Sequence, residues 1–273
     1  NSLNNLIDKN RDCTYLINNF NTIEDDTKFN IDTNASHFLA HLNQNKFSGS
    51  KKWLNYLIDK QFLIKNYLDT FFKTPKEHEG YIINEIISNL PKSTDVMIGN
   101  SSPIRDLDKF TLENDKSITI HSNRGVSGID GIISTAIGIS LDNKNTALII
   151  GDVSFFYDIS SLINNLNNNI NLKIFIINNN GGHIFDRLDG LKVEKNYKNY
   201  WLTPTVANIE NAAKLYECNY TRIDKTNFID IPKIVNKVSE HSKSIDLIEI
   251  KVDSKKHQLV DKKITENIKD ILN

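Results

Sequence analysis

A carboxylate and an amide follow two apolar runs of the chain, and both side chains are of a type that binds hard cations. Asp152 lies two residues after the end of the run 146–150, and Asn179 lies two residues after the end of the run 172–177. Magnesium takes about six oxygen ligands in near-octahedral geometry. Asp152, Asn179 and the backbone carbonyl of Gly181 could supply three of them. Two oxygens of a diphosphate and one water could complete the shell.

The residues around these ligands suit a phosphate group as well as a cation. Glycine lets backbone approach a ligand closely, and a helix that begins after Asp152 would offer free N–H groups to an anion. Either loop alone is also explained by a helix cap or an Asn/Gly turn, so the pair is what indicates a metal-bound diphosphate. The candidate cofactor-binding residues on the two loops are Gly151, Asp152, Val153, Ser154, Asn179, Gly181 and Gly182.

The elements that would bring the two loops together lie beyond residue 76, where apolar strand-like runs alternate with helical patterns. The expected strands are 95–98, 117–120, 146–150, 172–177, 220–223 and 247–252. The expected helices are 77–90, 104–112, 128–141, 155–167, 207–217, 229–239 and 264–272. This alternation predicts an α/β fold, a parallel sheet with helices on both faces, whose ligands bind beyond the carboxyl ends of the strands.

Residues 1–75 differ from the rest of the chain. They are rich in Asn and Asp up to Ser50, and a helical pattern then runs to Phe72 before Pro75 ends it. We predict the end of another domain with a connector helix at 1–75, and the diphosphate- and magnesium-binding domain at 76–273. Because the chain opens on Asn1 and its only methionine is Met97, we expect a fragment that lacks an amino-terminal part.

The bulk properties exclude several classes of protein. A net charge of −1 argues against a nucleic-acid partner, and no apolar run is long enough for a membrane span. Cys13 and Cys218 form no CxxC pair, which favours a reduced, cytoplasmic setting.

Four blocks in order carry a resemblance to a known family. The Gly-Asp and Asn-Asn loops resemble the signature of thiamine-diphosphate enzymes, although Val153 replaces their usual glycine. The blocks at 99–105, 122–131, 151–158 and 178–185 resemble the 2-succinyl-5-enolpyruvyl-6-hydroxy-3-cyclohexene-1-carboxylate synthases of menaquinone biosynthesis. His183 and the stretch 188–190 depart from that pattern. Residues 200–273 match more loosely, and 1–75 resemble a remnant of the family's middle domain.

The resemblance implies roles for further residues. The substrates would be 2-oxoglutarate and isochorismate, each with two carboxylates, and Arg105 and Arg124 match the arginines that bind them. Such a role suits the planar guanidinium fork, although an isolated loop arginine is more often solvated. Ser101 would donate a hydroxyl beside them. Ile129 matches the residue that props the cofactor in a bent shape. Two further matched residues, Ile184 and Phe185, would wall the cofactor and substrate.

The implied reaction is a transferase reaction that uses thiamine diphosphate and Mg²⁺ or Mn²⁺. It decarboxylates 2-oxoglutarate and adds the resulting succinyl carbanion to isochorismate. The family works as a homodimer or tetramer, in which the pyrimidine-binding domain of another subunit supplies a glutamate that activates the cofactor. We find no candidate for that glutamate within the sequence, and we therefore expect this chain to be inactive alone.

Two alternatives remain open. The first is another thiamine-diphosphate enzyme, such as a 2-oxoacid decarboxylase or an acetohydroxyacid synthase; the blocks at 99–105 and 122–131 argue against it. The second is a non-catalytic cofactor-binding module, which would keep Asp152 and Asn179 but would have no need of Arg105 and Arg124.

Overall fold

The computed structural model describes residues 7–18, 29–44, 49–111, 116–142, 145–167, 169–188, 190–193, 195–237 and 244–273. The chain divides into two compact units, Asn1–Asp59 and Lys60–Asn273, and the division falls within helix α3, Lys51–Phe71. Over the described residues, no helix combines the length and apolar character needed to cross a membrane.

The first unit is small. Strands β1, Tyr15–Asn18, and β2, Phe29–Asp32, pair in parallel, and the rings of Tyr15 and Phe29 stack with centroids 4.7 Å apart. A short η1 turn, Arg11–Cys13, precedes them and helix α2, Ala35–Gln44, follows. The Asn- and Asp-rich sequence up to Ser50 did not predict these elements. For α2 the reason is that none of its residues is buried, so the helix has no buried apolar face to mark it.

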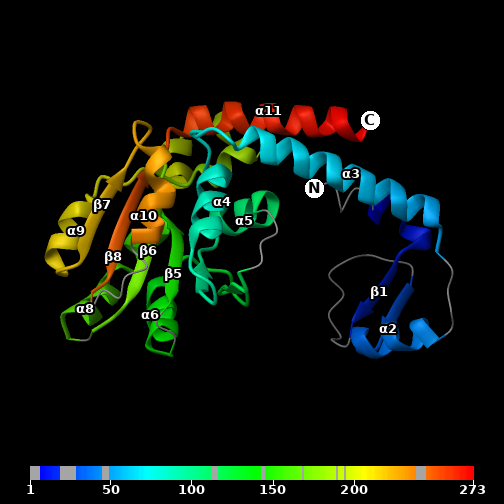
Figure 1. The fold of residues 1–273 in the computed structure, drawn as a ribbon, viewed down its shortest axis with the longest axis horizontal. Helices are drawn as coiled ribbons and strands as arrows, with labels where there is room; N and C mark the ends of the chain where they lie inside the picture. The colour runs from blue at the N-terminus through cyan, green and yellow to red at the C-terminus, as the bar shows by residue number, and fades with distance from the viewer. Residues whose placement is uncertain are drawn as a thin grey trace. The chain divides into compact units, whose positions relative to one another are not determined.

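The second unit is built on a six-stranded parallel sheet of order β4-β3-β5-β6-β8-β7 (Figure 1). Its strands are β3 Asp95–Ile98, β4 Thr119–His121, β5 Thr146–Gly151, β6 Leu172–Asn178, β7 Asn219–Ile223 and β8 Asp246–Lys251. Every predicted strand is present, within two residues at each end. The predicted α/β fold with a parallel sheet is confirmed.

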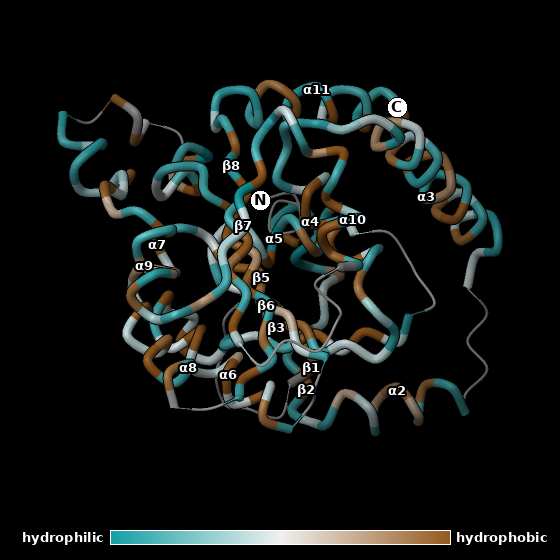
Figure 2. The backbone as a smooth tube through the Cα atoms, turned by 60° about the vertical axis from the view of Figure 1, so that its left-hand side comes forward, coloured by the Kyte–Doolittle hydropathy of each residue, from teal (hydrophilic) through white to brown (hydrophobic). Residues whose placement is uncertain are grey.

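Alternate residues of the strands enter two separate cores, one on each face of the sheet. Ile149 and Phe175 pack in the first core, whereas Leu148 and Ile174 pack in the second. The first core is closed by α4 Glu79–Asn89, α5 Ser102–Phe110, α10 Ile231–Lys237 and α11 Ser254–Leu272. The second is closed by α6 Ile132–Asp142, α7 Asp152–Tyr157 and α9 Ile209–Leu215. Burial on both faces explains the continuous apolar runs Ile149–Ile150 in β5 and Ile174–Ile177 in β6, and hydrophobic residues gather around these strands in Figure 2.

Three predicted helices differ from the observed ones by more than two residues at an end or by a break. The single helix expected at 155–167 is broken into α7, η2 Ile159–Ile163 and α8 Asn164–Asn167. Asp158 ends α7, and its carboxylate accepts hydrogen bonds from the Ser134 amide and the Ser161 hydroxyl. Helix α11 starts ten residues before the expected 264, capped by the preceding aspartate. Helix α6 starts at 132, four residues after the expected 128.

The predicted ends of two further helices, at Leu112 and Ser239, lie outside the described residues.

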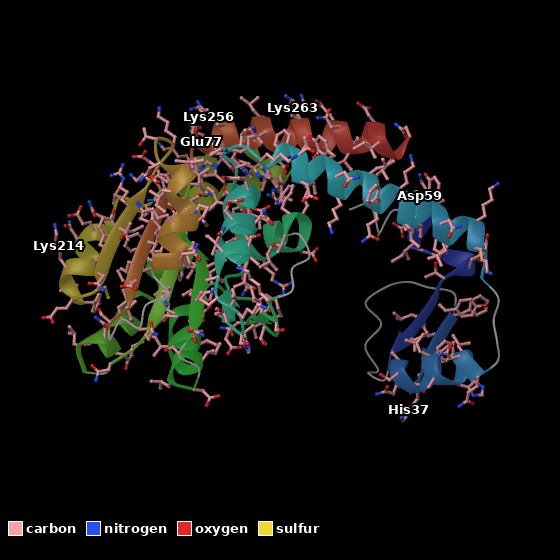
Figure 3. The ribbon with its side chains drawn as sticks, in the orientation of Figure 1. His37, Asp59, Glu77, Lys214, Lys256 and Lys263 are labelled. Atoms are coloured by element: carbon pink, nitrogen blue, oxygen red, sulfur yellow. The ribbon has the colours of Figure 1, made fainter. Side chains whose placement is uncertain are left out.

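The start of α4 is anchored to the start of α11. Glu77 pairs with Lys256 at 3.0 Å, and the two side chains lie close together in Figure 3. The backbone N–H of Asp253 also donates to Glu77 at 3.1 Å. One residue into α4, the backbone N–H of Glu79 donates to Nδ1 of His257 at 3.2 Å. These contacts fix the first turn of α4, which reaches the site described next.

The sheet has a topological switch at β3. The chain passes from β3 to its neighbour β4 on one side and then returns to β5 on the other side. In open parallel sheets, such a reversal leaves a crevice beyond the carboxyl ends of the two central strands. The loops after β3 and β5 are therefore the place where a ligand would bind.

Candidate functional site

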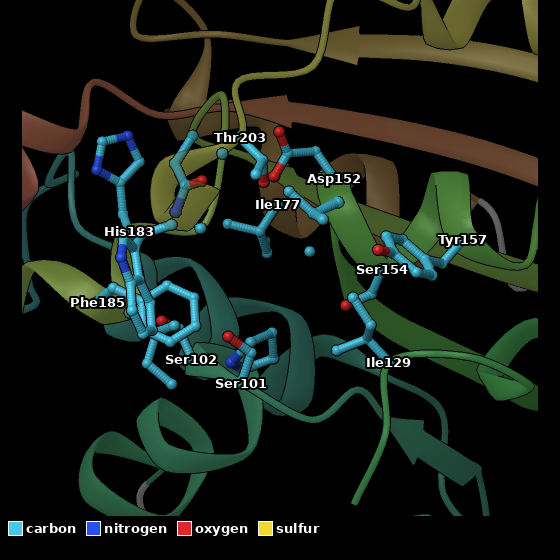
Figure 4. Close-up of a pocket in the computed structure, with 18 of the residues that line it drawn as sticks. Ser101, Ser102, Ile129, Asp152, Ser154, Tyr157, Ile177, His183, Phe185 and Thr203 are labelled. Carbon is cyan, nitrogen blue, oxygen red and sulfur yellow. The ribbon is translucent and has the colours of Figure 1, made fainter. Parts of the chain in front are cut away.

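A pocket of about 250 Å³ occupies this crevice (Figure 4). It brings together eleven of the thirteen residues singled out in the sequence, drawn from the loops after β3, β4, β5 and β6. They are Ser101, Ile129, Gly151, Asp152, Val153, Ser154, Asn179, Gly181, Gly182, Ile184 and Phe185.

Asp152 is a buried carboxyl group that lines the pocket. It is 1% exposed, and its Oδ2 has no hydrogen-bond partner among the described residues. Burial raises the pKa of this carboxyl to about 7, against the opposing effect of backbone N–H groups of Val153 and Gly181. An ionised carboxylate with an open oxygen in a buried site is costly unless a cation compensates it. The position therefore suits a metal ligand.

Asn179 presents a neutral oxygen to the same pocket. Its Nδ2 donates to Oε1 of Glu79 at 2.8 Å, so the amide nitrogen is turned toward Glu79 and the amide oxygen is turned away from it. Glu79, the first residue of α4, is 2% exposed and also lines the pocket.

The backbone of the pocket is held in uncommon conformations. Gly181 has a φ of +138°, and a Cβ there would lie 2.5 Å from the carbonyl oxygen of Leu202. Ser101 and Thr203, with φ of 76° and 41°, also line the pocket. Such strain persists only where surrounding structure holds it, and it gathers at functional sites. Glycine is required at 181 for both conformation and space.

The donor set fits a metal-diphosphate complex better than a bare ion. Over the described residues, no group of three or more His, Cys, Asp or Glu side chains is arranged to hold a metal. Asp152 would be one charged ligand, and Asn179 and the Gly181 carbonyl would be neutral ones. A hard divalent cation here would therefore need further oxygens from its ligand, as magnesium commonly takes from phosphates.

The two predicted substrate arginines do not line the pocket. Both side chains are exposed; Arg105 donates to the carbonyl of Ser101 at 2.6 Å, and Arg124 donates to Oδ1 of Asn100 at 3.1 Å. Asn100 also donates to two backbone carbonyls of the loop that carries Ile129, at 2.6 and 3.0 Å. Asn100 thus joins the segment 99–105, which contributes Ser101 to the pocket, to the segment 122–131, which contributes Ile129.

The sequence reasoning missed several pocket residues. Glu79 carried a signal, because it is a charged side chain within the apolar pattern of α4, where Tyr81 and Ile82 are also buried. Tyr200 and Trp201 carried none, since they follow no strand and match no motif. Trp201 packs edge-on against Phe185 with ring centroids 5.2 Å apart, and both line the pocket.

The segment that departs from the family pattern forms its own polar network. Nδ1 of His183 lies 2.8 Å from Oδ2 of Asp186, which also contacts Tyr197 and Gln258. Asp189, within the other departing stretch, lies outside the described residues. The network fixes the rim next to Ile184 and Phe185 through polar contacts that the family pattern did not predict.

The family that this chain matches binds a diphosphate cofactor, which agrees with the geometry of the pocket. Residues 109–250 match the family described as thiamine pyrophosphate enzyme, C-terminal TPP binding domain. A 2-succinyl-5-enolpyruvyl-6-hydroxy-3-cyclohexene-1-carboxylate synthase of Staphylococcus aureus is 34% identical over 230 residues, which are 84% of this chain and 39% of that protein. The synthase of Lysinibacillus sphaericus is 33% identical over 195 residues, 71% of this chain and 34% of that protein. The chain thus spans little more than a third of their length.

A solved structure shares the fold. Benzoylformate decarboxylase from Polynucleobacter necessarius superposes with a TM-score of 0.55 over 64% of this chain and 33% of that one, at 14% sequence identity.

Proposed function

We propose that this chain, which belongs to the thiamine pyrophosphate enzyme family through its C-terminal cofactor-binding domain, binds thiamine diphosphate and magnesium in the pocket at the carboxyl ends of β3, β5 and β6. We further propose that it is the cofactor-binding part of a 2-succinyl-5-enolpyruvyl-6-hydroxy-3-cyclohexene-1-carboxylate synthase. The observation that carries the proposal is the buried Asp152, whose open Oδ2 shares the pocket with Asn179 and Gly181.

The pocket residues that were predicted from the sequence have the following roles in this proposal. Asp152, the Asn179 amide oxygen and the Gly181 carbonyl hold the cation, and Gly151, Val153, Ser154 and Gly182 let backbone approach the diphosphate. Ile129 supports the bent cofactor, and Ile184 and Phe185 wall the reacting end. When bound, thiamine diphosphate supplies the thiazolium carbon on which a 2-oxoacid loses carbon dioxide.

Substrate choice is assigned to the arginines beside the pocket. Arg105 lies in the first half of α5 and Arg124 lies in the loop after β4, and Asn100 joins these two segments. A guanidinium pairs well with the carboxylates of 2-oxoglutarate and isochorismate. The similarity to two synthases over 71% and 84% of the chain favours this substrate pair over that of a generic 2-oxoacid decarboxylase. A module that only bound the cofactor would need neither arginine.

The chain alone should bind the cofactor but form no product. The proposed synthase needs a glutamate that activates the aminopyrimidine. Glu79, the one glutamate among the described residues that line the pocket, is engaged with Asn179 at the proposed metal end. The test is an assay of the 273-residue chain with cofactor, magnesium and both substrates, with and without a separately expressed amino-terminal half. We expect product only from the mixture. Robust turnover by the chain alone would mean that an activating group lies within it.

A further inference from the structure

Glu79 is a buried carboxylate in the wall of the pocket, 100 positions from the asparagine that it contacts. It opens α4, and its backbone N–H is fixed by Nδ1 of His257 on α11. Its Oε1 accepts from Nδ2 of Asn179 at 2.8 Å. Glu79 is thus fixed at its backbone by His257 of α11 and at its carboxylate by Asn179.

This contact decides which end of the Asn179 amide faces the pocket. The nitrogen and oxygen ends of an amide are nearly equal in size, and only the oxygen can bind a cation. A carboxylate accepts hydrogen bonds but does not donate, so it binds only the nitrogen end. With Nδ2 bound to Glu79, the oxygen is directed away from Glu79.

We infer that Glu79 is a positioning residue that orients Asn179 for the cation of the bound diphosphate. The inference rests on the proposed function. Partners behind a metal ligand commonly fix its orientation and its basicity.

The surroundings of Glu79 argue against a purely stabilising role. Glu79 and Asp152 are 2% and 1% exposed and line the same pocket, which places two carboxylates in one shielded space. Burying a charge that is not fully compensated generally costs stability, and an apolar residue of similar size is often as stable or better. A cation in the pocket would compensate both carboxylates.

The test compares variants of the 273-residue chain in calorimetric titrations with thiamine diphosphate, at fixed magnesium and in EDTA. Glu79→Ala should weaken magnesium-dependent binding by about 10- to 100-fold, as is common when a partner of a metal ligand is lost. Glu79→Gln should stay within about threefold, because its side-chain oxygen can still accept the same hydrogen bond. Glu79→Leu, which fills the space without an acceptor, should behave like Ala and serves if the Ala variant fails to fold.

Glu249 provides the matched control. It is 4% exposed, and its Oε1 accepts from Nδ2 of Asn178, the neighbour of Asn179, at 2.6 Å. It does not line the pocket. Glu249→Ala therefore removes an equivalent buried hydrogen bond one position away, and it should leave cofactor affinity unchanged.

A double-mutant cycle separates orientation from general damage. If Glu79 acts through Asn179, adding Asn179→Ala to Glu79→Ala should cost much less affinity than Asn179→Ala costs in the wild type. Unchanged affinity in Glu79→Ala and Glu79→Leu, or equal losses in the Ala and Gln variants, would overturn the inference. Absence of magnesium-dependent binding in the wild type would instead overturn the proposed function.

Discussion

Asp152→Ala is expected to abolish magnesium-dependent binding of thiamine diphosphate. Asp152 is the only charged member of the proposed ligand set, and its Oδ2 has no partner among the described residues. Asn179→Ala should weaken binding because it removes a neutral ligand. The loss should be at least the roughly 10- to 100-fold that is typical when a hydrogen-bond partner of a metal ligand is removed. Calorimetric titration of the cofactor with magnesium and with EDTA measures both losses.

The same substitution should not destabilise the protein without cofactor. A buried carboxylate with an open oxygen costs stability, so its removal should leave the melting temperature of the cofactor-free chain unchanged or higher. The wild type should melt higher when cofactor and magnesium are added, and Asp152→Ala should not. Asp106→Asn is the control, since Asp106 is fully buried and its Oδ2 has no hydrogen-bond partner within the described part of the chain, yet it does not line the pocket. If Asp152→Ala and the wild type bound thiamine diphosphate with equal affinity in the presence of magnesium, the assignment of the metal site would be wrong.

Arg105→Ala and Arg124→Ala should lower turnover steeply and leave cofactor affinity nearly intact. Neither side chain lines the pocket, so neither is expected to contact the diphosphate. Loss of a charged partner of a substrate carboxylate costs on the order of 2–5 kcal/mol, or roughly 30-fold to several-thousand-fold in rate. The measurement is kcat/KM for 2-oxoglutarate and isochorismate in a preparation that catalyses the complete reaction.

Arg222→Ala is the matched control for these variants. Arg222 is an exposed arginine at the other edge of the sheet, in β7, and it does not line the pocket. It should retain normal turnover. If both Arg105→Ala and Arg124→Ala also used isochorismate normally, the synthase assignment would lose its main support, and a generic 2-oxoacid decarboxylase would be favoured.

The centre of the sheet was predictable because β5 and β6 are buried on both faces. Ile149–Ile150 and Ile174–Ile177 are continuously apolar, and successive residues of these runs enter opposite cores. The family was predictable from the four sequence blocks at 99–105, 122–131, 151–158 and 178–185. Membership of the chain in the thiamine pyrophosphate enzyme family is confirmed. The break in the helix expected at 155–167 was not predictable, because it depends on contacts between Asp158 and the distant Ser134.

The site was predictable where it depends on loops that directly follow strands. Asp152 and Asn179 were found because the carboxyl ends of β5 and β6 adjoin in a parallel sheet. Glu79 was missed because it contacts Asn179 across 100 positions of the chain, which no local pattern encodes. Trp201 was missed because it reaches the pocket by packing on Phe185, which no local pattern encodes.

The most direct test of the account is a crystal structure of the chain grown with thiamine diphosphate and Mn²⁺, with anomalous diffraction used to locate the manganese. The account predicts one manganese in the pocket, about 2.1 Å from a carboxylate oxygen of Asp152, the amide oxygen of Asn179 and the carbonyl oxygen of Gly181. The diphosphate should complete its shell. A cofactor bound in the pocket with the manganese elsewhere, or with no contact to Asp152, would contradict it.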